Sequence, residues 1–189
     1  MSRRAQVLPA PHRFTREEYH GMADLLRNER VELLDGIIMT MSRQNSPYTA
    51  TVHRLLFSLL RILGPTAYVR VQAPLILTDW SEPEPDIAVC QPDPNDYARE
   101  HPQAHQVLLI IEVADTSLAY DRTQKASAYA AGGIPEYWTV NLNERRVEVR
   151  ADPDPSTGRY SREKLAHEGE EFILPGGQTV AVSDILPLL

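Results

Sequence analysis

Apolar runs alternate with polar, proline-bearing segments along this chain, and their spacing predicts a sheet covered by helices. The run from Val107 to Ile111 is short and rich in branched aliphatic residues, which is typical of a strand buried on both faces. Residues 46–63 instead repeat apolar side chains at helical spacing, and Ser46-Pro47 supplies an N-cap followed by proline at the first helical position. The apolar positions of this expected helix are Val52, Leu55, Leu56, Leu59, Leu60 and Leu63.

Local signals predict the remaining elements. Thr15 and Glu18 form a capping box, so we expect a helix that ends near Arg27. Asp35-Gly36 lies between two apolar runs and predicts a hairpin over residues 31–42. Further strands are expected over 68–77, 85–90, 107–113, 136–141, 145–150, 160–167 and 179–182, a third helix over 118–131, and loops over 91–106 and 152–158.

The order of these elements predicts the fold class. The central part reads helix, three strands, helix, strand, which is an αβββαβ core of an α/β fold with a mixed sheet. An N-terminal helix and hairpin precede this core, and extra C-terminal strands follow it. Residues 1–13 contain two prolines and no periodicity, so we expect a flexible arm there and a single domain over residues 14–189.

Composition narrows the class of protein. The chain has 189 residues, of which 42% are hydrophobic, and it contains neither an apolar run long enough for a membrane span nor the apolar core of a signal peptide. The single cysteine, Cys90, excludes an internal disulfide and fits a cytoplasmic protein. A net charge of -7 argues against a protein that coats nucleic acid non-specifically, although an acidic site that binds metal remains compatible with it.

Three charged residues lie next to or between the expected buried elements and are candidate site residues. Glu112 directly follows the apolar strand, and Asp86 follows Pro85 where another strand begins. Lys125 lies in the expected helix after Glu112, and only it and Lys164 are lysines. A buried acid needs a cation, a proton or a dense shell of hydrogen bonds. The pattern therefore predicts either a catalytic site or a buried ion pair of Glu112 with Lys125, while Asp86 could simply cap the entrance of its strand.

Several segments together resemble the PD-(D/E)XK nuclease superfamily and, more closely, its bacterial "putative restriction endonuclease" family. The matching segments are VELLDGIIMTMS, PDIAV, IIEV and YDRTQKASAYAAGGIPEYWTVN, and the likeness covers roughly residues 14–150. In the superfamily a lysine stands two residues after the glutamate, where this chain has Ala114. The resembling family supplies that lysine from the following helix, and Lys125 matches it. The Ser-Pro-Ser that many relatives carry after the strand is absent here.

The resemblance implies a restriction endonuclease-like fold and a nuclease site. Asp86 and Glu112 are expected to bind Mg²⁺, or Mn²⁺, and Glu32 on the hairpin is expected to bind it directly or through water. Lys125 would orient the attacking water or offset charge on the phosphate. DNA is the expected partner, and two-fold symmetry makes a homodimer the expected assembly. Supporting positions are expected for Gln72 and Asp121, and for Tyr129, which follows Lys125 by one helical turn and is expected to hold it.

Two functions remain open at this stage. One is a Mg²⁺-dependent endonuclease that cuts DNA, and the other is a nuclease-fold module kept for binding or assembly, with weak or no catalysis. The simpler alternatives for single residues also remain: Glu32 as a solvent-facing strand acid, and Asp121 with Lys125 as a pair on a helix surface. Tyr137 and Trp138 are expected to pack within the sheet and not to stack on bases.

Overall fold

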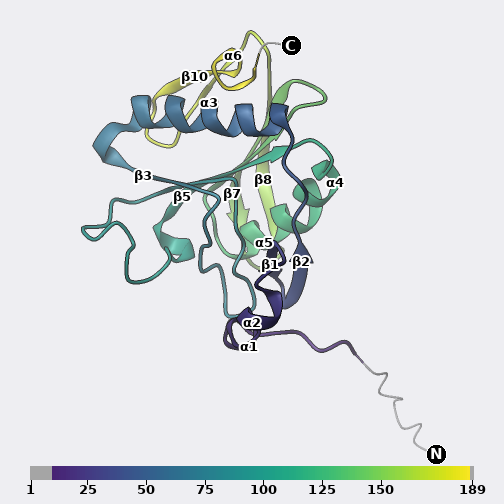
Figure 1. Cartoon of the computed structure of the whole chain (residues 1–189). Coiled ribbons are helices and arrows are strands. Elements are labelled where there is room, and N and C mark those ends of the chain that lie inside the picture. The colour runs from purple at the N-terminus through teal and green to yellow at the C-terminus, as the bar shows by residue number, and fades with distance from the viewer. Residues whose placement is uncertain (1–9, 188–189) are drawn as a thin grey trace, which may run out of the picture.

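A six-stranded mixed sheet forms the centre of the protein, and the computed structural model describes residues 10–187 (Figure 1). The strands lie in the order β3-β4-β5-β6-β7-β8; β5 and β6 run parallel, and the other neighbouring pairs run antiparallel. The predicted αβββαβ core is confirmed. The strands are β3 Tyr68–Val71, β4 Ile87–Cys90, β5 Val107–Ala114, β6 Glu136–Asn141, β7 Arg146–Asp154 and β8 Arg159–His167.

Strand β5 is central, as its apolar run predicts, because β4 and β6 flank it and both of its faces are covered. Successive side chains of a strand point to opposite faces. Leu109, Ile111 and Val113 therefore face one layer of the core, whereas Ile110 faces the other. By the same alternation Glu112 lies on the face of Ile110.

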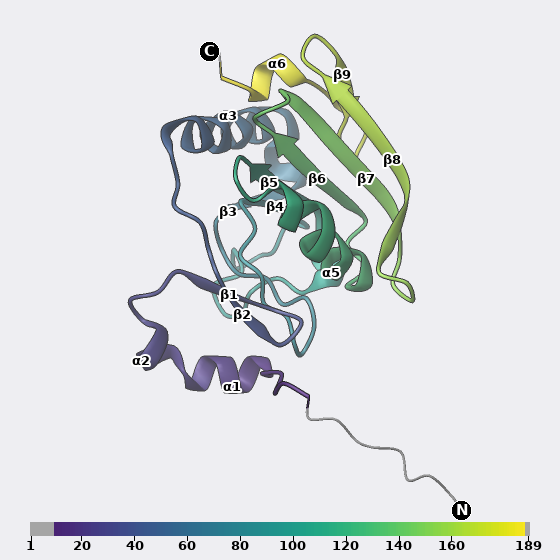
Figure 2. The ribbon, with the colours of Figure 1, turned by 90° about the vertical axis from the view of Figure 1, so that its right-hand side faces the viewer.

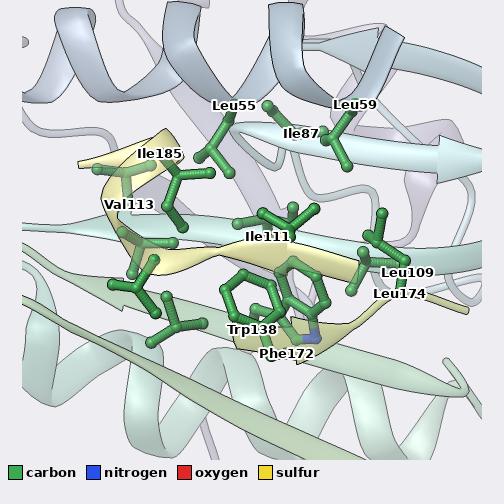
Figure 3. Packing of buried hydrophobic residues seen from close by; sticks show 14 of the residues in the cluster. Leu55, Leu59, Ile87, Leu109, Ile111, Val113, Trp138, Phe172, Leu174 and Ile185 are labelled. Carbon is green, nitrogen blue, oxygen red and sulfur yellow. The ribbon is translucent and has the colours of Figure 1, made fainter. Parts of the chain in front are cut away.

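Helix α3, Ser46–Leu63, covers the first face (Figures 1 and 3). Leu55 and Leu59 point from it toward Ile87 and Ile111 of the sheet. The helix has the predicted bounds, but its N-cap is Asn45 and not Ser46, because the Asn45 side chain accepts the Tyr48 N–H. The predicted apolar stripe is also too wide, since Leu60 is 48% exposed.

The C-terminal segments cover the same face as α3. They comprise β9 Glu171–Ile173, β10 Thr179–Ala181 and α6 Val182–Ile185. Phe172 packs edge to face on Trp138, with the ring centroids 4.5 Å apart (Figure 3). The strand predicted over 179–182 is present as β10 but ends at Ala181, because Val182 begins α6; β9 and α6 were not predicted.

The helical segment after β5 covers the opposite face (Figure 2). It begins as α4 Leu118–Tyr120, passes through a π-helical turn, η3 Asp121–Lys125, and ends as α5 Ala126–Ala131. Ala126, Ala128 and Tyr129 pack with Ile110 and Tyr137 of the sheet. The expected helix over 118–131 is therefore present but is interrupted by one wider turn.

The N-terminal elements lie at the lower end of this second layer (Figures 1 and 2). Thr15 and Glu18 form the predicted capping box, but the helix breaks at Met22 into α1 Arg16–Gly21 and α2 Ala23–Leu26. The hairpin is confirmed as β1 Val31–Leu34 and β2 Ile37–Thr40. Its turn residues both have positive φ, 50° at Asp35 and 75° at Gly36, which matches the right-handed twist of the strands.

Some expectations about single segments need correction. The strand expected over 68–77 ends at Val71, because Gln72 adopts a positive φ of 47°. The loop expected over 152–158 begins later, since β7 continues to Asp154. Of the expected N-terminal arm, residues 1–9 lie outside the described part, while Arg13 donates a hydrogen bond to the Asp35 carbonyl at 2.5 Å. The shorter turns are the 3-10 segments η1 Gly64–Thr66 and η2 Ala104–Gln106.

None of the helices within residues 10–187 has the length and hydrophobicity needed to cross a membrane.

Candidate functional site

The expected site residues gather at one end of the sheet. Asp86 immediately precedes β4, and Glu112 lies near the end of β5. The antiparallel register places Ile87 opposite Ile111, so Asp86 and Glu112 are neighbours across the two strands. An Asp86 carboxylate oxygen, Oδ2, accepts the backbone N–H of Val113 at 2.7 Å. The two carboxylates are therefore held side by side.

Lys125 joins this pair from the helical layer. Its Nζ lies 2.8 Å from Oε1 of Glu112 and 3.2 Å from Oε1 of Glu32. All three side chains are buried, with residue exposures of 5% or less. One ammonium thus bridges an acid of the sheet and an acid of the hairpin, which are 80 positions apart in the chain (112 − 32).

The π-helical turn determines where Lys125 and Asp121 lie. It spans Asp121–Lys125, and both of its terminal residues are buried although Thr123 and Gln124 between them are exposed. A π-turn widens the helix by one residue and is frequent at functional sites. Asp121 accepts the Ser117 hydroxyl at 2.6 Å and does not form an ion pair with Lys125 within the described residues. The interpretation of these two residues as a pair on a helix surface is wrong.

Glu32 is enclosed by protein, so its interpretation as a solvent-facing acid is also wrong. It is 3% exposed. While Oε1 faces Lys125, Oε2 accepts the backbone N–H of Glu84 at 3.0 Å. Both oxygens therefore already have a donor. The described contacts make Glu32 a partner that holds Lys125, and its direct binding to a metal stays a prediction.

The supporting residues lie close to their expected places, with one change of partner. The Tyr129 hydroxyl donates to Oε1 of Glu112 at 2.7 Å, so Tyr129 holds the glutamate and not Lys125 as expected. Gln72 Nε2 donates to the hydroxyl of Tyr48 at 2.9 Å, and that hydroxyl in turn donates to Oδ1 of Asp86.

Negative charge outweighs positive charge in this cluster. Burial raises the pKa of Asp86 and, together with repulsion from Asp86, Asp121 and Glu32, it raises the pKa of Glu112 well above its ordinary value. Burial likewise raises the pKa of Asp121 to about 6. Burial opposes the charge on Lys125, but attraction by Glu112, Glu32 and Asp121 outweighs it and holds the pKa of Lys125 well above normal. Lys125 therefore stays charged, and its single positive charge cannot neutralise all four carboxyl groups of the cluster.

A cavity of about 140 Å³ opens onto these residues. Two arginines, Arg30 and Arg43, also line it. Arg30 is half-buried, and with the Gln44 amide oriented so that its oxygen faces the guanidinium, Nη1 of Arg30 donates to that oxygen at 2.8 Å. The remaining lining comes from the segment 40–45, Tyr48, the segment 115–117 and Tyr120.

The donor set suits a hard divalent cation bound by two carboxylates. Among residues 10–187, no group of three or more His, Cys, Asp and Glu side chains is arranged to hold a metal ion. Mg²⁺, however, is commonly held by one or two carboxylates together with water and phosphate oxygens. Asp86 and Glu112 are two such ligands, and no hydrogen bond from the described residues reaches Oε2 of Glu112. The excess of acids therefore fits Mg²⁺ at Asp86 and Glu112.

Tyr48, Arg30 and Arg43 line the cavity but were not expected from the sequence. Tyr48 follows Ser46-Pro47, which reads only as a helix start, and its contact with Asp86 spans 38 positions. Arg30 precedes the hairpin and carries no local signal. His53 on α3 is exposed and does not border the cavity.

The aromatic residues of β6 have the role expected of them. Tyr137 and Trp138 are fully buried in the sheet, so neither ring is available to stack on a base.

Comparisons with known proteins identify relatives of this fold. The family model described as "Uma2: Putative restriction endonuclease" matches residues 16–187. A solved structure, that of a putative nuclease belonging to DUF820 from Anabaena variabilis ATCC 29413, is similar with a TM-score of 0.72 and 15% sequence identity. The similarity covers 91% of this chain and 97% of that one, and at such low identity it shows the fold. No curated protein matches the chain.

Proposed function

This chain belongs to the Uma2 family of putative restriction endonucleases, and from that premise we propose that it is a Mg²⁺-dependent endonuclease that hydrolyses phosphodiester bonds in DNA. One observation carries the proposal. Asp86 and Glu112 lie side by side in an acid-rich cluster that includes a buried, charged Lys125, and this cluster opens onto a cavity. The family description supports the class of reaction.

The residues divide the work as follows. Asp86 and Glu112 hold Mg²⁺, or Mn²⁺ in its place. When bound, the metal polarises the phosphate and lowers the pKa of a water molecule. Lys125 offsets the negative charge that develops on the phosphate, and Glu32 and Glu112 fix the position of its ammonium. Tyr129 fixes Glu112.

The arginines at the cavity suit the anionic substrate. An acidic cluster repels a phosphodiester, so cations are needed where the backbone approaches. Arg30 and Arg43 line the same cavity as the acids, and neither forms an ion pair within residues 10–187. Within this part of the chain neither guanidinium has a carboxylate partner, so both can bind phosphate oxygens, Arg30 in exchange for its hydrogen bond to the neutral Gln44 amide.

We also propose that the active form is a homodimer, because cutting both strands of a duplex needs two sites that face opposite strands. Two-fold symmetry is the commonest way to supply two such sites.

Nicking of supercoiled plasmid in Mg²⁺ and in Mn²⁺ tests the proposal. Wild type should nick, whereas Asp86→Asn and Glu112→Gln should lose most of the activity, and calorimetry should show that both bind the metal more weakly. Glu100→Gln is the matched control, because Glu100 is exposed and does not line the cavity. Equal metal affinity in wild type and Glu112→Gln would contradict the proposed site.

A second candidate is a nuclease-fold module that binds or assembles without cutting. The arrangement of Lys125 favours it, since the ammonium is already engaged by two buried carboxylates and position 114 holds alanine. This module would bind duplex DNA in a gel-shift assay, yet it would leave plasmid intact in every metal tried. Detectable nicking that disappears in Glu112→Gln excludes it.

A further inference from the structure

Tyr48 connects helix α3 directly to the acidic cluster. Its hydroxyl donates to Oδ1 of Asp86 and accepts the Nε2 amide of Gln72 at 2.9 Å. Because the Val113 N–H binds Oδ2 at 2.7 Å, each oxygen of Asp86 has one donor. A carboxylate oxygen can accept more than one bond, so each oxygen retains a lone pair for a cation.

The backbone around Tyr48 fixes the direction of its side chain. The Asn45 carboxamide oxygen accepts the Tyr48 N–H at 3.0 Å, and the Asn45 Nδ2 donates to Asp115 at 2.6 Å. Asp115 directly follows β5, the strand that carries Glu112. The first turn of α3 is therefore tied to the same strand end as the acids, and Tyr48 has little freedom to turn away from Asp86.

Gln72 supplies a second, independent constraint. It has a φ of 47°, a left-handed conformation that is uncommon for a residue other than glycine, asparagine or aspartate. In this conformation its backbone N–H donates to the Asp86 carbonyl at 3.1 Å while its side chain reaches the Tyr48 hydroxyl. One strained residue thus contacts both members of the Tyr48–Asp86 pair, which accounts for the early end of β3.

We infer that Tyr48 is a positioning residue that sets the Asp86 carboxylate for metal binding, and that Gln72 orients the Tyr48 hydroxyl. The inference rests on the proposed metal site at Asp86 and Glu112. Partners that orient metal ligands in this way commonly account for 10- to 100-fold in metal affinity. A purely structural Tyr48 would instead act through its ring, which packs against the core cluster beneath α3.

The change Tyr48→Phe separates these two roles, because it keeps the ring and removes only the hydroxyl. Tyr160→Phe is the matched control, since the Tyr160 hydroxyl donates to the Ile134 carbonyl at 3.0 Å and lies outside the cavity lining. Mn²⁺ is titrated calorimetrically into wild type and both variants, with melting temperatures measured in parallel. Tyr48→Phe should bind Mn²⁺ about 10- to 100-fold more weakly, while Tyr160→Phe retains wild-type affinity.

Gln72→Asn provides a second arm that does not depend on the folding of Tyr48→Phe. Asparagine tolerates the left-handed backbone but is too short to reach the same hydroxyl. The Mn²⁺ affinity of Gln72→Asn should also fall, by a smaller factor than that of Tyr48→Phe. If Tyr48→Phe is unfolded, the affinity of Gln72→Asn alone tests the role of the Tyr48 hydroxyl. If Tyr48→Phe binds Mn²⁺ with wild-type affinity, the proposed role of Tyr48 is wrong and the proposed metal site stands. The same conclusion follows from wild-type affinity in Gln72→Asn if Tyr48→Phe is unfolded. A wild type that takes up no Mn²⁺ overturns both.

Discussion

Replacing Lys125 by methionine should strongly destabilise the protein. Methionine keeps a long, flexible, mainly apolar side chain but removes the ammonium that lies 2.8 Å from Glu112 and 3.2 Å from Glu32. Both carboxylates are buried, at 4% and 3% exposure, so they would lose their cation without gaining water. Loss of one partner of a buried ion pair typically costs about 3–5 kcal/mol.

That magnitude is large enough to measure easily. For a chain of this size each kcal/mol lowers the melting temperature by about 2–4 °C, so the expected decrease is roughly 6–20 °C. The decrease should be smaller at pH 5 than at pH 8. Burial and neighbouring carboxylates already raise the pKa of Glu112, and loss of the ammonium raises it further. A carboxyl group with a raised pKa gains folding stability as the pH falls through that value.

Thermal and urea unfolding of the metal-free protein provide the assay. Lys164→Met is the matched control, because Lys164 is the other lysine of the chain and is exposed on β8. It should change stability by less than about 0.5 kcal/mol. A Lys125→Met protein that melts with wild type, or a Lys164→Met protein that is equally destabilised, would refute the reasoning.

Magnesium extends the same experiment to function. A ligand that binds only the folded state stabilises it by mass action. If Asp86 and Glu112 bind Mg²⁺, millimolar Mg²⁺ should raise the melting temperature of Lys125→Met more than that of wild type, because the cation replaces the lost ammonium. If Mg²⁺ has no effect on either protein, the carboxylates do not form a metal site.

Four further outcomes are expected. Hydrogen bonds from Arg122, Asn141 and Arg150 lower the pKa of Glu148 to about 2. Glu148→Gln should therefore lower the free energy of unfolding by about 3 kcal/mol at pH 7. In urea unfolding, this loss of stability should become smaller as the pH falls from 4.5 toward 2. Burial raises the pKa of Asp121 to about 6. Asp121→Asn should therefore stabilise the protein at pH 7 by up to about 3 kcal/mol, and weakening of the hydrogen bond from Ser117 reduces this gain. Calorimetric melting should show no gain in stability below pH 3.8. Restoring lysine at position 114 in a Lys125→Ala protein should return part of the plasmid nicking, and a nicking assay that shows no recovery would contradict the equivalence of the two positions. Light scattering at micromolar concentration should give about twice the 21.3 kDa mass of one chain, whereas the mass of a single chain would contradict the proposed homodimer.

The fold was predictable where hydrophobic periods are long. Helix α3 and strand β5 have their expected positions because their apolar residues repeat over many positions. The prediction failed where contacts from distant segments decide the backbone. Strand β3 ends early because Gln72 turns to bind Asp86 and Tyr48, and neither partner is near it in the chain.

The candidate site shows the same division. Asp86 and Glu112 were recognisable because acids at the ends of apolar strands need an explanation, and Lys125 followed from its match to the family pattern. The burial of Glu32 could not be predicted, since the alternation within β1 does not show that Lys125 and the backbone of Glu84 enclose its side chain. Arg30 lines the cavity together with residues 40–45, which connect the hairpin to α3, and no local pattern encodes that position.

The position of the lysine explains why stability and activity are difficult to separate in this protein. Ala114 lies two residues after Glu112 on β5, so both side chains point to the same face of the sheet, the face covered by α5. A lysine at either position 114 or position 125 can therefore approach the Glu112 carboxylate. Lys125 additionally binds Glu32 and so ties the hairpin to the sheet. A single substitution at Lys125 removes both the structural bridge and the proposed catalytic charge. Loss of stability therefore does not by itself distinguish a nuclease from a binding module, and plasmid nicking by wild type and Glu112→Gln makes that distinction.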